Sequence, residues 1–191
     1  MLGSPAVGGG RSPSNTTVAF LGACAALSAA TAAFILTGYR LAGGLTAAAA
    51  TVCLLAGTIS ARAGGSSRGM FTESILDRVF DACVLGPVAW VFRSGAPRLT
   101  ALALIGLGAA YVASYERAKA SSLGYRSSEG LAYRTVRSAL LVLGLLTGWI
   151  EIALWAFAAL TTAAAAVRTW NVAAQESRGR VTRAAGLPGE R

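Results

Sequence analysis

The sequence contains no histidine among its 191 residues. Nucleophilic sites built on Ser-His-Asp or Cys-His pairs, and metal sites ligated by imidazole, are therefore excluded. Any acid-base chemistry must come from Asp, Glu, Lys, Tyr or a bound ion. The three cysteines, Cys24, Cys53 and Cys83, fall inside apolar stretches and form no C-x-x-C pair. The sequence therefore supports neither a disulfide framework nor a zinc site.

Charged residues are also scarce. They make up 13% of the chain, about half the share typical of soluble domains, whereas 54% of the residues are hydrophobic and the mean hydropathy is +0.57. The apolar residues come in long uncharged runs, and a membrane-spanning helix needs about 20 such residues. We therefore expect an all-α polytopic membrane protein, folded as a bundle of six transmembrane helices.

The runs place these spans near residues 17–37, 42–61, 71–92, 98–115, 131–149 and 151–171. Residues 16–172 accordingly form the predicted transmembrane domain. The first segment, 1–15, is rich in Gly, Pro and Ser, and the last, 173–191, is basic. We expect both to be disordered tails.

The basic residues are distributed unequally between the two sides of the predicted bundle. Thirteen lysines and arginines lie in the tails and the loops after the second and fourth spans or in the span ends next to them, against three in or next to the other loops. Both termini should therefore be cytoplasmic, and the protein should lie in the cell (plasma) membrane. The formal net charge of +9 is explained by this topology and by anionic lipid headgroups, so we expect no nucleic-acid partner.

Glu73, Asp77 and Asp81 follow one another at steps of four residues near the cytoplasmic start of the third span. On a helix this spacing places all three carboxylates along one stripe, where they repel each other unless a cation lies opposite. The cation could be a metal ion or an arginine, and the candidate arginines are Arg62, Arg68 and Arg78. A functional metal site and a purely structural ion-pair network therefore both remain open.

The segment that contains Ala61-Arg62, Gly69, Glu73 and Asp77 resembles the second half of a known signature. The signature is D-x-x-D-G-x-x-A-R, a spacer, then G-x-x-x-D-x-x-x-D, and it belongs to the CDP-alcohol phosphatidyltransferases. A second block, SYERAKASSLGY at 114–125 and the basic segment up to 137, is similar to their phosphatidylinositol-phosphate synthase branch. The resemblance covers roughly residues 15–170.

The resemblance implies the transfer of a phosphatidyl group from a CDP-lipid to a small alcohol or inositol phosphate in phospholipid biosynthesis. In the family, two Mg2+ or Mn2+ ions held by aspartates of two helices grip the pyrophosphate. Carried over to this chain, the resemblance makes Glu73 and Asp77 metal ligands and Asp77 the group that activates the alcohol. It assigns CDP-lipid binding to Arg62 and Gly69, and acceptor-phosphate binding to Arg134 and Arg137.

The chain departs from the signature in its first half. The two aspartate positions of the second span are Leu54 and Gly57, the following glycine is Thr58, and the first aspartate of the third span is Glu73. Two carboxylates can hold at most a single Mg2+ or Mn2+ together with water and substrate phosphate. We therefore expect weakened or lost catalysis, as in a pseudoenzyme.

The sequence leaves three functions open. The first is a divergent phosphatidyltransferase, and a homodimer is expected from the resemblance. The second is a non-catalytic relative that binds lipid or CDP-lipid, or docks on an active homologue as a heterodimer partner. The third is a small cation transporter that uses the acidic stripe, although no inverted repeat supports it.

Overall fold

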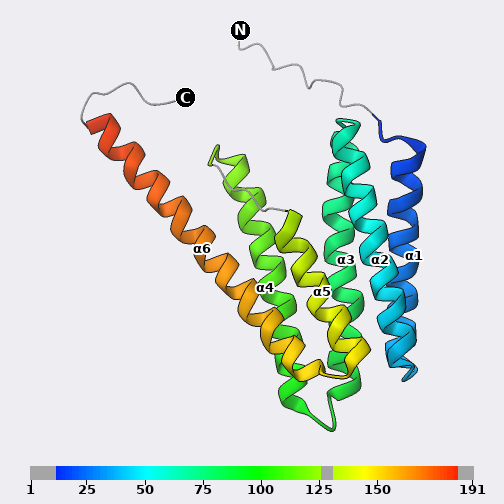
Figure 1. Ribbon diagram of the computed structural model, residues 1–191. Coiled ribbons are helices and arrows are strands. Elements are labelled where there is room, and N and C mark those ends of the chain that lie inside the picture. The colour runs from blue at the N-terminus through cyan, green and yellow to red at the C-terminus, as the bar shows by residue number, and fades with distance from the viewer. Residues whose placement is uncertain (1–11, 126–130, 185–191) are drawn as a thin grey trace. The chain divides into compact units, whose positions relative to one another are not determined.

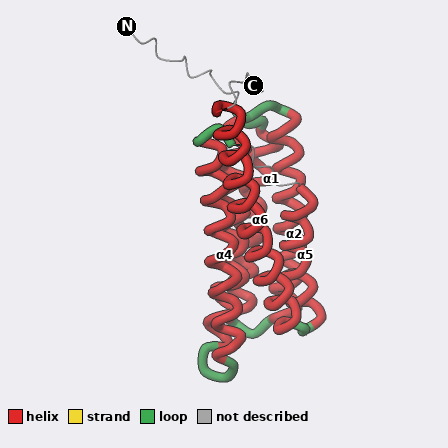
Figure 2. The backbone as a smooth tube through the Cα atoms, turned by 90° about the vertical axis from the view of Figure 1, so that its left-hand side faces the viewer, coloured by secondary structure: helices red, strands yellow, loops and turns green. Residues whose placement is uncertain are grey.

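The computed structural model describes residues 12–125 and 131–184, and these are helical apart from short connections (Figure 1, Figure 2). The described ranges contain no β-strand, which confirms the all-α class. The helices are α1 (Asn15–Leu36), α2 (Arg40–Ala63), α3 (Ser67–Phe92), α4 (Pro97–Ser122), α5 (Leu131–Thr147) and α6 (Ile150–Ala184).

Two helices extend well beyond the runs that predicted them. Helix α4 continues to Ser122 and α6 continues to Ala184. The first part of the predicted basic tail, 173–184, is therefore helical, because Ala, Gln, Glu and Arg are compatible with a helix that leaves the apolar region. The remainder of that tail and residues 1–11 lie outside the described residues.

Four helices are long and apolar enough to cross a membrane: α1, α2, α4 and the Ile150–Gln175 part of α6. Helix α5 has only 17 residues, and α3 carries the charged residues of the acidic stripe. This observation supports a membrane protein with at least these four candidate spans within the described residues.

The chain divides into two compact units, Met1–Val84 and Leu85–Arg191, with the boundary inside α3. In the first unit α1 and α2 run antiparallel side by side (Figure 1). The Thr17 and Ser60 hydroxyls lie 2.7 Å apart at one end of the pair, and Thr31 donates to Thr46 over 3.0 Å further along. Side-chain hydrogen bonds of this kind tie helices together where no hydrophobic effect operates between them.

In the second unit α6 lies parallel to α4 and antiparallel to α5. Arg98 and Glu151 form an ion pair of 2.6 Å at the N-terminal ends of α4 and α6, and the Arg168 guanidinium donates to the Ala113 carbonyl over 2.6 Å towards their C-terminal ends. The tight turn between α5 and α6 uses Gly148 at a φ of +85°. Gly106 allows a close contact between α4 and α6, since a Cβ on it would lie 2.9 Å from Cδ1 of Phe157.

Candidate functional site

The acidic stripe lies on the first half of α3. The helix begins after Gly65, whose φ of +60° reverses the chain, and the Ser66 hydroxyl accepts a hydrogen bond of 3.0 Å from the Gly69 amide. This serine cap satisfies one of the amides that the first turn of a helix leaves without a partner. The loop and the cap thereby set the rotation at which the acidic side chains leave α3.

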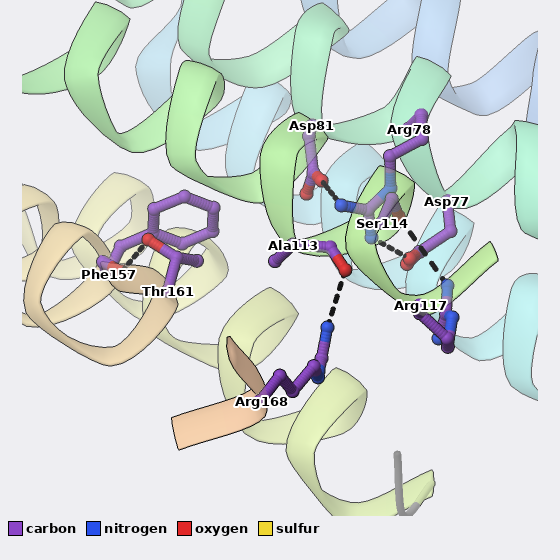
Figure 3. A network of polar contacts seen from close by, with 9 residues as sticks. All are labelled: Asp77, Arg78, Asp81, Ala113, Ser114, Arg117, Phe157, Thr161 and Arg168. Carbon is purple, nitrogen blue, oxygen red and sulfur yellow. Dashed lines mark hydrogen bonds and ion pairs between the residues drawn. The ribbon is translucent and has the colours of Figure 1, made fainter. Parts of the chain in front are cut away.

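All three carboxylates of the stripe are buried. Glu73, Asp77 and Asp81 are 3%, 1% and 0% exposed. The Arg78 guanidinium is paired with both aspartates, through one nitrogen with Asp77 and through Nη1 with Oδ2 of Asp81 at 3.4 Å (Figure 3). Of the arginines that the sequence offers, the structure thus places Arg78 against the stripe. Buried charges are tolerated in proteins when they are paired in this way.

The two positions of α2 that would carry the signature aspartates are filled by packing. Leu54 is 5% exposed and forms an apolar cluster with Leu21 and Cys24 of α1. Gly57 is so close to α1 that a Cβ on it would lie 2.8 Å from Cδ2 of Leu21. Thr58 turns its hydroxyl back to the Leu54 carbonyl at 2.8 Å. This face of α2 therefore presents apolar contacts and no carboxylate.

These residues do not fit a two-metal centre. In the described ranges no three Asp, Glu, Cys or His side chains are grouped so that they could hold a metal ion. The stripe supplies carboxylates from α3 alone, and the α2 positions supply none. Convergent oxygen ligands from two helices, which two hard divalent cations require, are missing from this donor set.

The two predicted CDP-lipid residues have different surroundings. Arg62 is exposed in the last turn of α2, where its guanidinium can reach a solute phosphate. Gly69 is buried, and a Cβ on it would lie 2.9 Å from the Ala61 Cβ and 3.2 Å from the Ser66 Oγ. The immediate reason for glycine at position 69 is thus the close approach of α2 and α3.

The predicted acceptor residues belong to the second unit. Arg134 and Arg137 are one helical turn apart on α5, and both are buried, at 8% and 1% exposed. The Arg137 Cζ lies 5.9 Å from the centre of the Phe157 ring of α6, a cation-π distance. Two guanidinium groups on one side of a helix form the kind of positive site that binds phosphate.

Polar contacts between α4 and α6 were not among the sequence predictions. The Arg168 guanidinium donates to the Ala113 carbonyl (Figure 3). One turn of α4 further on, the Thr169 hydroxyl donates to Glu116 Oε1 over 3.1 Å. The signal available in the sequence was an acid, Glu116, directly after the apolar run 98–115 and an arginine, Arg168, inside the run 151–171.

No family model matches the chain. Individual proteins do. The chain is 34% identical over 125 residues to the phosphatidylinositol phosphate synthase of Corynebacterium glutamicum, with 60% of this chain and 57% of that protein covered. It is 32% identical over 137 residues to the archaetidylinositol phosphate synthase of Methanothermobacter thermautotrophicus, with 71% and 66% covered. The chain belongs to the CDP-alcohol phosphatidyltransferase family.

The fold agrees with this membership. The crystal structure of Mycobacterium tuberculosis phosphatidylinositol phosphate synthase with CDP-DAG bound superposes with a TM-score of 0.70 at 21% identity, covering 85% of this chain and 87% of that one. This likeness concerns the fold alone. The chain spans less than two thirds of the length of each of the two relatives matched by sequence. Enzymes of the CDP-alcohol phosphatidyltransferase family typically depend on Mg2+ or Mn2+.

Proposed function

We propose that this protein binds a CDP-lipid within the scaffold of a phosphatidylinositol-phosphate synthase, and that its phosphatidyl transfer is weakened or lost. CDP-lipid binding is supported by the membership of the family and by the two relatives matched by sequence. Their names are phosphatidylinositol phosphate synthase and archaetidylinositol phosphate synthase. The catalytic half rests on one observation, the apolar packing of Leu54 and Gly57 against Leu21.

That observation bears on catalysis because phosphoryl transfer depends on positioning and on neutralising charge. A leucine and a glycine can do neither at the two places where the family signature has carboxylates. Arg78 supplies positive charge to the remaining aspartates, but a guanidinium paired with Asp77 and Asp81 cannot also bridge the pyrophosphate oxygens as a metal ion does.

The remaining assignments follow the same scaffold. The exposed Arg62 contacts the nucleotide side of the CDP-lipid, and Gly69 keeps α2 and α3 close enough to form that side of the site. Arg134 and Arg137 bind the phosphate of the acceptor. Glu73 and Asp77 hold at most one Mg2+ or Mn2+, and any residual proton transfer falls to Asp77.

The proposal also includes the topology. All six helices cross the cell membrane, with both termini and the site on the cytoplasmic side, as the distribution of lysine and arginine indicates. The short α5 and the charged α3 are included among these spans. The protein acts as a homodimer or alongside an active homologue.

The test compares binding and turnover in the same purified sample. The detergent-solubilised chain is titrated with CDP-diacylglycerol, and CMP release is then measured with Mg2+ or Mn2+ and a series of acceptors, including inositol phosphate. The Corynebacterium glutamicum relative serves as the reference under identical conditions. We expect saturable CDP-lipid binding and CMP release that is more than about 100-fold slower than in the reference.

The two halves of the proposal can fail separately. Absence of saturable CDP-lipid binding would remove the binding half, and the search would then turn to protein partners. CMP release within about tenfold of the reference would remove the catalytic half, because packing at positions 54 and 57 would then not matter for the reaction.

A further inference from the structure

Helix α3 contains Pro87 in its interior, directly after Gly86. Proline has no amide hydrogen, and its ring clashes with the carbonyl four residues earlier, here that of Cys83. Glycine adds backbone freedom to the same turn. Sharp bends of helices occur at such residues. Residues 83–87 are therefore the part of α3 where the helix axis can change direction at the lowest cost.

The boundary between the two compact units of the chain falls in this same turn. The first unit ends at Val84 and the second begins at Leu85. A boundary of this kind marks the place in a chain that few contacts cross. The least rigid turn of α3 therefore coincides with the point at which the chain joins the two units.

Each part of α3 is held by its own unit. Before the turn, Gly69 lies closely against Ala61 of α2, and Leu76 packs against the apolar cluster of α1 and α2. After the turn, the Ala89 carbonyl accepts a hydrogen bond of 3.1 Å from the Thr100 hydroxyl of α4. Each of these contacts lies within one unit, so a change of angle at residues 83–87 leaves all of them intact.

We propose that residues 83–87 form a hinge about which the two units change their relative orientation. In hinge motions a few residues absorb the change in backbone angles while the packed bodies on either side stay rigid. The residues assigned to the CDP-lipid belong to the first unit, and those assigned to the acceptor belong to the second. On the basis of the proposed function, the hinge therefore controls the separation of two substrates whose reacting groups must meet. The hinge itself does not depend on that assignment.

The experiment measures distances between the units of the full chain in lipid nanodiscs, by double electron-electron resonance and without ligands. The three cysteines are replaced by alanine, and spin labels are attached to Ile59→Cys of α2 and Val136→Cys of α5, both at exposed positions. A second labelled pair, Leu45→Cys and Ile59→Cys, lies within α2 and gives the width that the labels alone produce. We expect the distance distribution of the pair between the units to be about twofold wider or more.

The variant Gly86→Ala/Pro87→Ala tests the hinge directly. It supplies the amide that completes the helical hydrogen bond to the carbonyl of residue 83. A Cβ at position 86 meets nothing within 4 Å, so the variant adds no clash there. The distance distribution between the units should narrow to the width of the pair within α2.

Pro97→Ala/Gly108→Ala is the matched control, because it makes the same two replacements in α4. Pro97 lies in the first turn of that helix, where a proline removes no helical hydrogen bond. A Cβ at position 108 likewise meets nothing within 4 Å. This control should keep the broad distribution of the cysteine-free chain.

The hinge is overturned if the pair between the units gives a distribution as narrow as the pair within α2. It is also overturned if Gly86→Ala/Pro87→Ala keeps the broad distribution, or if the matched control narrows it equally. Because no ligand is present in these measurements, absence of CDP-lipid binding would remove the proposed function and leave the hinge standing.

Discussion

Gly69 of α3 lies against Ala61 of α2 so closely that a Cβ on the glycine would be only 2.9 Å from the alanine Cβ. An alanine Cβ cannot rotate away, so a larger residue at position 69 must push the two helix backbones apart. The glycine of the family motif therefore has a packing role in this chain, in addition to any contact with a ligand.

Gly69→Ala should lower the free energy of unfolding by about 1–3 kcal/mol, because the new methyl group overpacks the α2–α3 contact. The thermal midpoint in detergent reports this loss. The double variant Gly69→Ala/Ala61→Gly, which removes the opposing methyl group, should regain most of the stability and the same CDP-lipid affinity as the wild type.

Gly108→Ala in α4 is the control, because a Cβ there would meet nothing within 4 Å. It should be neutral or slightly stabilising, as expected for Gly to Ala in a helix. If the double variant recovers stability but not CDP-lipid affinity, ligand approach rather than packing explains the glycine.

Arg78→Leu should be strongly destabilising, by about 3 kcal/mol, because it removes the guanidinium that pairs with the buried Asp77 and Asp81. Replacing both aspartates by asparagine in the same chain should recover most of the lost stability. Positions 77 and 81 then carry no buried charge that needs the guanidinium as a partner. Thermal unfolding in detergent measures both effects.

The exposed pair of Arg98 and Glu151 provides the comparison, at 69% and 50% side-chain exposure. Arg98→Leu should cost less than about 1 kcal/mol, because solvent screens such a pair. Similar losses for Arg78→Leu and Arg98→Leu would mean that the Arg78 pairs contribute little to the stability of the fold.

The helices could be predicted because a chain in a bilayer must satisfy its backbone polar groups internally, so each long apolar run becomes a helix. The ends of α4 and α6 could not be placed in the same way. Apolar run length marks where the hydrocarbon region ends, whereas the helices continue through polar residues to Ser122 and Ala184.

The sequence spacing correctly placed Glu73, Asp77 and Asp81 on one helix, and all three are buried. It left the partner open, because Arg62, Arg68 and Arg78 all lie within a few turns of the stripe. The choice of Arg78 depends on the rotation of α3 and on side-chain rotamers, which follow from tertiary packing. The contact between Gly57 and Leu21 likewise joins two helices, so it could not be predicted from the local sequence of either one.

Arg134→Gln and Arg137→Gln should each weaken the binding of inositol phosphate by about tenfold, because each removes a charge-assisted contact to the phosphate. Calorimetric titration of the purified chain measures this. Arg93→Gln, an exposed arginine that stacks 4.0 Å from the centre of the Trp90 ring, should leave the affinity unchanged. Unaltered binding in both α5 variants would place the acceptor phosphate elsewhere.

Restoring the carboxylates of α2 should restore a metal site only if space is made for them. A side chain at position 57 would meet Leu21 Cδ2 at 2.8 Å, so the variant to build is Leu21→Ala/Leu54→Asp/Gly57→Asp. We expect it to bind Mn2+ and to release CMP from CDP-diacylglycerol faster than the wild type. Manganese titration followed by electron paramagnetic resonance and the CMP assay provide two independent readouts.

The matched control carries Leu21→Ala with asparagine at both positions, which reproduces the size of the aspartates without their charge. This control should unfold at about the same temperature as the aspartate variant and should gain neither Mn2+ binding nor CMP release. Because only the carboxylate charge differs between the two, a gain confined to the aspartate variant would assign the weakened transfer to the missing ligands. Equal Mn2+ binding and CMP release in the wild type, the control and the aspartate variant would instead mean that positions 54 and 57 take no part in the reaction.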